Sequence, residues 1–250
     1  MSSSGRLLGP SRRAARTTTD DARAPRGGAS GRQPAVYRAD PGRRWSPGDA
    51  LVAQLELAQS RGAIGPGSVS GHIAHALGFL EAWPELAVAA TILDLGSGGG
   101  LPGLVLAARL PAVRFWLLEG RIGRARALES AVRQLGWEER VTVLAERAEL
   151  AARRREMRAA FAAVVARSFA PAAATAECGA GFLASGGVLV VSGPPRRARE
   201  RWPGRPLGEL GLEIVQIRTT PRSFVILRQV TPCPERFPRR LGVPEHRPLF

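Results

Sequence analysis

Residues 92–103 read ILDLGSGGGLPG, and this stretch decides the fold of the chain. An apolar run that contains Asp94 leads into a glycine-rich turn, and helical sequence follows the turn. Gly96, Gly98 and Gly100 stand at alternate positions, where the missing Cβ lets the backbone turn sharply and approach a ligand. The first N–H groups of the following helix point back at such a ligand. The stretch therefore predicts a strand, a ligand-binding turn and a helix.

Strand and helix alternate on the C-terminal side of this turn. Short apolar runs predict strands at 91–95, 113–119, 141–145, 161–166 and 187–191, with helical sequence at 103–110, 122–135, 149–160 and 172–183. Such alternation indicates βαβ units and a parallel sheet. The β-rich runs 212–217 and 223–230 have no helical pattern between them, which predicts an adjacent antiparallel pair. We therefore expect an α/β fold with a Rossmann-like parallel sheet that ends in an antiparallel strand.

The sequence before the sheet divides into two parts. Residues 45–90 predict a small helical segment, with one helix at 47–61 and another at 68–83 that has Ser68 as its N-cap. Residues 1–44 are rich in Ser, Gly, Pro, Ala and Arg and have no apolar periodicity, which predicts a disordered basic tail. A nucleic-acid-binding arm and a merely solvated tail both fit these residues. The sheet domain is expected over 91–250.

Positive charge is concentrated at the two ends of the chain. All 36 basic residues are Arg, against 21 acidic residues, for a formal net charge of +15. Residues 1–44 and residues 196–250 each have a net charge of +7, which leaves +1 for the sequence between them. An excess of this size predicts an anionic partner such as nucleic acid.

Several classes of protein are disfavoured by composition. The sequence has no run of about 18 apolar residues, which a membrane-spanning helix needs. The first residues lack the apolar core of a secretory signal, and the two Cys cannot form a disulfide framework. We therefore expect a cytoplasmic protein with no membrane partner. The three His and two Cys are scattered, so no metal site is expected, and His72 and His75 are interpreted as packed or solvated side chains.

Two kinds of cofactor fit the glycine turn. The spacing Gly98-x-Gly100-x-x-Gly103 matches the dinucleotide fingerprint, so NAD or FAD has to be considered. The pattern apolar-apolar-Asp-x-Gly-x-Gly-x-Gly is the first motif of class I S-adenosylmethionine-dependent methyltransferases, and Asp94 suits the cationic amino-acid end of that cofactor. Glu119, at the end of the next strand, fits either cofactor because a carboxylate can accept hydrogen bonds from two ribose hydroxyls. The terminal antiparallel pair favours S-adenosylmethionine.

Four stretches resemble a known family, the bacterial guanine-N7 methyltransferases of 16S ribosomal RNA of the glucose-inhibited-division B type. They are LPG at 101–103, RAE at 147–149, ARSFA at 166–170, and RFPRRLGVP at 236–244 with Pro248-Leu249. The first extends the glycine turn, and the next two follow the third and fourth predicted strands. The resemblance covers roughly residues 91–250, and the order of the motifs makes it specific.

The resemblance implies that S-adenosylmethionine is the cofactor and that Gly96, Leu101, Ala148, Glu149 and Arg167 contact it. The residues themselves are compatible with this role. Ala148 leaves room for an adenine ring, and Arg167 follows the fourth strand, where it faces the ligand crevice of an open α/β sheet. Together with the residues of the turn and the second strand, the predicted cofactor site comprises Asp94, Gly96, Gly98, Gly100, Leu101, Glu119, Ala148, Glu149 and Arg167.

The resemblance also implies ribosomal RNA or the 30S subunit as partner. The family usually carries Lys-Gly after the fifth strand, whereas this chain has Ser192-Gly193 followed by two prolines. Five arginines are candidates for contacts with RNA phosphates. They are Arg196 and Arg197, which stand where they can compensate for the missing lysine, and Arg236, Arg239 and Arg240 in the C-terminal motif.

Methylation of guanine N7 requires no general base, because the nitrogen already has an available lone pair. Catalysis then comes mainly from positioning, and no catalytic side chain is expected. Two other functions remain open at this point. One is a methyltransferase of the same fold that acts on a small molecule, and the other is a catalytically silent, RNA-binding relative.

Overall fold

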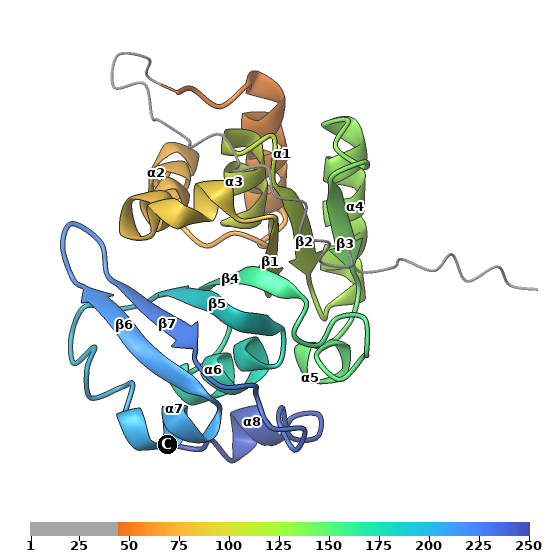
Figure 1. The fold of residues 1–250 in the computed structure, drawn as a ribbon. Coiled ribbons are helices and arrows are strands. Elements are labelled where there is room, and N and C mark those ends of the chain that lie inside the picture. Colours follow the sequence, from red (N-terminus) through yellow and green to blue (C-terminus); the bar gives the residue numbers. More distant parts are fainter. Residues whose placement is uncertain (1–44) are drawn as a thin grey trace, which may run out of the picture.

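The structure, a computed structural model, describes residues 45–250 (Figure 1). The disordered tail predicted for residues 1–44 lies outside the described residues. The predicted helices before the sheet are present as α1 (Asp49–Ser60) and α2 (Val69–Ala82). Ser68 is the N-cap of α2, as expected, and its hydroxyl accepts a hydrogen bond from the backbone N–H of Gly71 at 3.1 Å.

A seven-stranded sheet forms the centre of the molecule. Its strands are β1 (Thr91–Leu95), β2 (Arg114–Leu118), β3 (Val141–Leu144), β4 (Phe161–Arg167), β5 (Leu183–Ser192), β6 (Leu212–Arg218) and β7 (Phe224–Gln229). They lie in the order β3-β2-β1-β4-β5-β7-β6. The first five are parallel, and β7 is antiparallel to both of its neighbours, which confirms the predicted sheet.

Helices cover both faces of this sheet (Figure 1). One layer contains α1, α2, a short 3-10 helix (Pro84–Val88), α3 (Gly103–Arg109) and α4 (Ile122–Gln134). The other contains α5 (Ala148–Ala151), α6 (Ala172–Ala180), α7 (Gly204–Glu209) and α8 (Val243–His246). The parallel strands are therefore buried on both sides, which explains why their sequences are continuously apolar rather than alternating.

Two hydrophobic cores result from this arrangement. In β1, Ile92 belongs to the core under α1 to α4, and the next residue, Leu93, belongs to the core on the opposite face. Leu55 of α1 and Phe79 of α2 are fully buried in the same core as Ile92. The helical segment 45–90 therefore shares its core with the sheet.

The prediction of a helix over 149–160 was wrong in length, because α5 ends at Ala151. The residues that follow form turns, and Ala159 has a φ of 52°, in the left-handed region. Arg153 donates to the carbonyl of Pro238 at 2.6 Å, and Arg158 donates to that of Phe237 at 2.8 Å. These contacts with the C-terminal segment override a local helical preference that is worth only a few tenths of a kcal/mol per residue.

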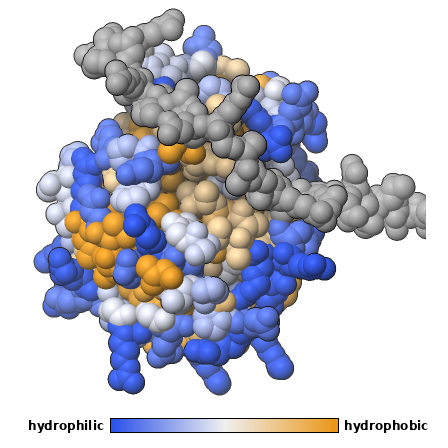
Figure 2. Space-filling view, in the orientation of Figure 1, coloured by the Kyte–Doolittle hydropathy of each residue, from blue (hydrophilic) through white to orange (hydrophobic). Residues whose placement is uncertain are grey.

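The antiparallel side of the sheet ends in β6. Figure 2 shows apolar side chains gathered over β6 and β7, and hydrophilic side chains around the rim of the same face. Val215 of β6 is 38% exposed.

None of the helices within residues 45–250 has the length and apolar character needed to cross a membrane.

Candidate functional site

A cavity of about 430 Å³ opens at the carboxyl ends of the parallel strands, beside the glycine turn. From β1 the chain adds β2 and β3 on one side of the sheet, and it then adds β4 and β5 on the other side of β1. The direction in which strands are added therefore reverses between β1 and β4. Open α/β sheets bind their ligands at this kind of position. Seven of the nine predicted cofactor residues lie in the wall of the cavity, namely Gly96, Gly98, Leu101, Glu119, Ala148, Glu149 and Arg167.

The glycine turn has a backbone that other residues rarely adopt. The φ angles of Gly96, Gly98 and Gly100 are 74°, 56° and 97°, all in the left-handed region. A Cβ on Gly96 would overlap the ring of Phe169, and one on Gly100 would overlap the side chain of Leu104. The glycines therefore set the shape of the turn as well as its distance from a ligand.

Glu119 connects the end of β2 to this turn. The backbone N–H of Gly98 donates to its Oε2 at 2.9 Å, and the backbone N–H of Arg121 donates to its Oε1 at 2.8 Å. A carboxylate offers about four acceptor positions, so Glu119 can accept further hydrogen bonds from a ligand in the cavity. The side chain thus orders the turn and presents acceptors to the cavity at the same time.

Asp94 lies behind the turn and is absent from the cavity wall, as is Gly100. The carboxyl group is fully buried, and its Oδ2 accepts a hydrogen bond from the backbone N–H of Gly103 at 2.9 Å. Its Oδ1 has no hydrogen-bond partner among the described residues. Burial raises the pKa of Asp94 to about 7. Asp94 therefore holds the start of α3 from behind the turn, and its contact with the charged end of the cofactor stays a prediction.

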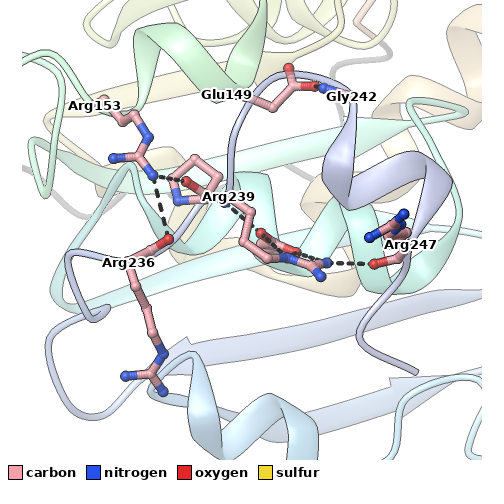
Figure 3. A network of polar contacts seen from close by, with 8 residues as sticks. Glu149, Arg153, Arg236, Arg239, Gly242 and Arg247 are labelled. Atoms are coloured by element: carbon pink, nitrogen blue, oxygen red, sulfur yellow. Dashed lines mark hydrogen bonds and ion pairs between the residues drawn. The ribbon is translucent and has the colours of Figure 1, made fainter.

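Glu149 is held by the C-terminal segment. The backbone N–H of Gly242 donates to its Oε1 at 3.0 Å (Figure 3). The guanidinium of Arg147 donates to the same oxygen at 3.0 Å. Burial raises the pKa of the Glu149 carboxyl, but these hydrogen bonds outweigh burial and hold the pKa below its usual value. Pro244 and Glu245 follow in the cavity wall. The C-terminal motif therefore completes one side of the site, which the sequence alone did not indicate.

The five predicted RNA-binding arginines differ in their surroundings. The guanidinium of Arg239 is engaged within the protein, where it donates to Glu177 and to the carbonyl of Arg247, each at 2.7 Å (Figure 3). Arg236 is exposed, and its side chain points away from this network in Figure 3. The remaining three are also exposed, namely Arg196, Arg197 and Arg240. Arg239 thus has an internal ion pair that was not predicted, and its contact with phosphate stays a prediction.

Arg167 has a partner that the sequence analysis did not foresee. Its Nη2 lies 2.7 Å from Nδ1 of His72 on α2. His72, which was predicted to be packed or solvated, therefore also makes a specific side-chain contact. The guanidinium Nη1 is buried and has no hydrogen-bond partner among residues 45–250. Burial lowers the pKa of Arg167. The two residues are 95 positions apart in the sequence, so their contact could not be predicted from local patterns. The one local hint in the sequence was that His72 lies close to the Gly-Pro-Gly break at 65–67, between the two predicted helices.

Two further possibilities for chemistry were considered in the described residues. No group of three or more His, Cys, Asp and Glu side chains in that part of the chain could hold a metal ion. Cys178 lies in the cavity wall, but burial raises the pKa of its thiol well above the usual value. The thiol therefore stays protonated at neutral pH and is a weak nucleophile.

Comparison with protein families gives a match that covers most of the site. A model of the family described as rRNA small subunit methyltransferase G matches residues 66–196. A protein named ribosomal RNA small subunit methyltransferase G from Thermotoga neapolitana is 33% identical over 167 residues, which are 64% of this chain and 72% of the relative. One of the same name from Parasynechococcus marenigrum is 32% identical over 171 residues, 63% of this chain and 66% of the relative. The chain thus spans about two thirds of these relatives.

Solved structures show the same fold at lower identity. An O-methyltransferase from Bacillus cereus in complex with SAH has a TM-score of 0.52 and 15% identity, and the match covers 73% of this chain and 91% of that one. The O-methyltransferase TomG from Streptomyces achromogenes, in complex with SAM, has a TM-score of 0.52 and 20% identity, with 74% and 91% covered. At such identities the likeness establishes the fold alone.

Proposed function

The chain belongs to the rRNA small subunit methyltransferase G family, and on this basis we propose that it transfers a methyl group from S-adenosylmethionine to N7 of a guanine in 16S ribosomal RNA. The matched residues 66–196 include the glycine turn, Glu119 and Arg167. The observation that carries the proposal is that these three features, which are far apart in sequence, line one cavity at the carboxyl ends of the strands.

The cavity wall suits the parts of S-adenosylmethionine. Glu119 retains acceptor positions for the ribose hydroxyls, and the small side chain of Ala148 leaves space for the adenine ring. Arg167 has a buried donor without a partner in the described chain, which suits the carboxylate of the methionine part. A buried donor of this kind gains free energy when a charged acceptor reaches it. When bound, the cofactor supplies a methyl group on a positively charged sulfur.

The chain's own residues have to bind and orient the guanine rather than remove a proton from it. N7 carries its lone pair in the plane of the base and is unprotonated at neutral pH. Holding the base so that this lone pair points along the direction of transfer converts an encounter in solution into an ordered approach, and such ordering lowers the barrier by several kcal/mol. The wall of the cavity therefore has to supply shape and fixed hydrogen bonds.

Exposed arginines near the sheet ends suit the phosphates of RNA. Arg196 and Arg197 follow β5, and Arg236 and Arg240 belong to the C-terminal segment that closes the cavity. Each phosphate contact releases counterions and strengthens binding as the salt concentration falls. We place the reaction in the cytoplasm, with the 30S subunit or its RNA as partner.

Transfer of a labelled methyl group tests this function directly. The protein is incubated with labelled S-adenosylmethionine and either 30S subunits or naked 16S RNA, and the modified nucleotide is identified by chemical cleavage at N7-methylguanine. We expect label at one guanine with one of the two substrates, and a much weaker signal for Glu119→Gln as the matched control. Absence of labelled N7-methylguanine with both substrates, over a range of salt concentrations, would contradict the proposal.

Calorimetry with S-adenosylhomocysteine separates the alternatives. Binding of that product together with weak RNA affinity at low salt would indicate a small-molecule substrate. RNA binding without affinity for the product would indicate a catalytically silent relative.

A further inference from the structure

We propose that His72 is a positioning residue that holds the Arg167 guanidinium in the cofactor cavity and joins it to the connection between α1 and α2. The helical segment before the sheet would then help to position a side chain of the cofactor site. The consequence for cofactor binding rests on the function proposed above, whereas the contact itself does not depend on it.

The two ring nitrogens of His72 have different partners, and these partners fix its protonation. Nδ1 lies 2.7 Å from Nη2 of Arg167, and a guanidinium can only donate, so Nδ1 has to accept. Nε2 lies 3.1 Å from the carbonyl oxygen of Gly65, which can only accept, so Nε2 has to carry the hydrogen. His72 is therefore neutral, in the Nε2–H tautomer.

The contact with Gly65 makes the imidazole a bridge between two walls of the cavity. Ala63, Ile64 and Gly65 of the α1–α2 connection line the cavity, as does Arg167 at the end of β4. Gln59, at the end of α1, donates to the same Gly65 carbonyl at 2.9 Å. The Gly65 carbonyl is thus bound by the Gln59 amide from α1 and by the His72 imidazole from α2. Of these two side chains, His72 is the one that also contacts Arg167.

The groups that surround His72 leave Arg167 as the partner of its Nδ1. The groups that face it are the Arg167 guanidinium and, on its own helix, His75, which in turn faces Arg222. Burial, followed by the charge of Arg167, lowers the pKa of His75 to about 4, so His75 is neutral at pH 7. None of the carboxylates described in residues 45–250 is hydrogen-bonded to His72 or Arg167. A proton on Nδ1 would therefore face a guanidinium donor and break the contact.

The Arg167 side chain lines the cavity, and the contact with His72 holds its guanidinium in one orientation there. Nη2 is bound to His72, whereas Nη1 has no partner in the described part of the chain. A free arginine side chain has many rotamers, and ordering it on binding costs free energy. His72 removes that cost beforehand, because the side chain is already held in one geometry.

Nuclear magnetic resonance of imidazole nitrogens tests the contact without any cofactor. The full chain is labelled with ¹⁵N in histidine, and the long-range proton–nitrogen spectrum is recorded near pH 7.5 for the wild type and for Arg167→Met. We expect His72 to show a protonated Nε2 and an unprotonated Nδ1 whose shift changes in Arg167→Met. A protonated Nδ1, or a His72 signal that is unaffected by the Arg167 substitution, would overturn the proposal.

Binding of S-adenosylhomocysteine, measured by calorimetry, tests the consequence. His72→Phe keeps a ring of similar shape without nitrogens, and His72→Gln restores one acceptor and one donor. His75→Phe is the matched control, because His75 is one turn away and packs against Phe79 and Phe224. We expect about tenfold weaker binding for His72→Phe, because the Arg167 side chain would then have to be ordered on binding, with most of the affinity restored in His72→Gln and an unchanged affinity in the control.

Two results would contradict the positioning role in this binding experiment. One is wild-type affinity in His72→Phe, and the other is an equal loss in His72→Phe and His72→Gln. Thermal unfolding of each variant shows whether the fold is retained. If the wild type itself does not bind S-adenosylhomocysteine, the function proposed above fails, and the tautomer and its response to Arg167→Met still decide whether the contact exists.

Discussion

The guanidinium of Arg239 is paired with the carboxylate of Glu177, with Nη2 of the arginine 2.7 Å from Oε2 of the glutamate. The backbone N–H of Arg239 also donates to Oε1 at 2.6 Å, and the Glu177 side chain is fully buried. An arginine that was expected to contact RNA is thus part of the attachment of the C-terminal segment to α6. The contribution of this pair to stability can be measured, and four other features of the structure lead to testable predictions.

Replacing Arg239 by Met should destabilise the fold, because it leaves the buried Glu177 carboxylate without a compensating charge. Removal of one partner of a buried pair costs about 3 kcal/mol or more. We expect a fall of this size in the free energy of unfolding, measured by urea denaturation. Arg240→Met, at the exposed neighbouring position, is the matched control and should change stability by less than about 0.5 kcal/mol. The double change Glu177→Leu/Arg239→Met should cost less than the sum of its single changes, and a strictly additive result would contradict a coupled pair.

Asp94 should make stability fall as the pH rises. Its folded pKa of about 7 lies above the value of 3.8 that applies when the group is unperturbed, so between these values the folded chain holds a proton that the unfolded chain has released. Asp94→Asn keeps the acceptor for Gly103 and removes the ionisation. We therefore expect the free energy of unfolding of the variant minus that of the wild type to increase between about pH 4 and pH 7. The total increase should be at most about 4 kcal/mol, and the difference should be constant above pH 7. Urea denaturation at a series of pH values measures this difference, and a difference that is constant with pH would refute the placement of the proton.

Gly100→Ala should deform the glycine turn. The new methyl group would overlap Leu104, and its backbone would have to keep a φ of 97°. We expect a loss of about 1–3 kcal/mol in stability, together with weaker binding of S-adenosylhomocysteine in calorimetry. Gly123→Ala in α4 is the control, because nothing lies near its added Cβ, and it should be neutral or slightly stabilising. Equal effects of the two changes would argue against strain in the turn.

Glu119→Gln should weaken cofactor binding while the chain stays folded. An amide has one acceptor oxygen, so it cannot accept from Gly98, Arg121 and a ribose together, and its NH₂ group faces a backbone donor. We expect at least about tenfold weaker binding of S-adenosylhomocysteine, which corresponds to one hydrogen bond to a charged group. Glu138→Gln, at an exposed position, should bind as the wild type does. Equal affinity of the two variants in calorimetry would show that Glu119 does not contact the ligand.

The exposed arginines should determine how RNA binding depends on salt. Arg236→Ala and Arg240→Ala should each reduce the slope of the logarithm of the binding constant against the logarithm of salt concentration by about one, if each side chain contacts one phosphate. Filter binding of 16S RNA at several salt concentrations measures that slope. Arg126→Ala, exposed on α4, carries the same change of charge and serves as control. Identical slopes for all three variants would mean that the C-terminal arginines do not touch the RNA.

The fold, the glycine turn and the place of Glu119 were predictable because their signals are local. The run from Ile92 to Gly103 contains the strand, the turn and the start of the helix, and the apolar runs that follow are separated by helical sequence. Glu119 was located by the same reasoning, since the ends of neighbouring parallel strands meet at one edge of the sheet. Its position in the cavity wall follows from topology alone.

The remaining features depend on contacts between distant residues. The length of α5 is set by the carbonyl groups of the C-terminal segment that Arg153 and Arg158 reach. The partners of Arg167 and Arg239 lie 95 and 62 positions away, and each arginine is one of 36 in a chain where composition makes arginine uninformative. The contact of Asp94 with Gly103 was not foreseen for a related reason, because its motif identified the turn but not the side of the turn on which the carboxyl group lies.

The hydrogen bond between Gly242 and Glu149 has a consequence for how the cavity is assembled during synthesis. The two residues are 93 positions apart, and Pro244 and Glu245 of the wall are made later still. Synthesis runs from the N-terminus, so the parallel strands, the glycine turn and Glu149 are all made well before the segment that closes over them. We therefore expect a nascent chain that has stopped short of Gly242 to contain the parallel sheet with its cavity open on one side. The full affinity of this protein for its cofactor would then be acquired only after Gly242 to Glu245 have been made.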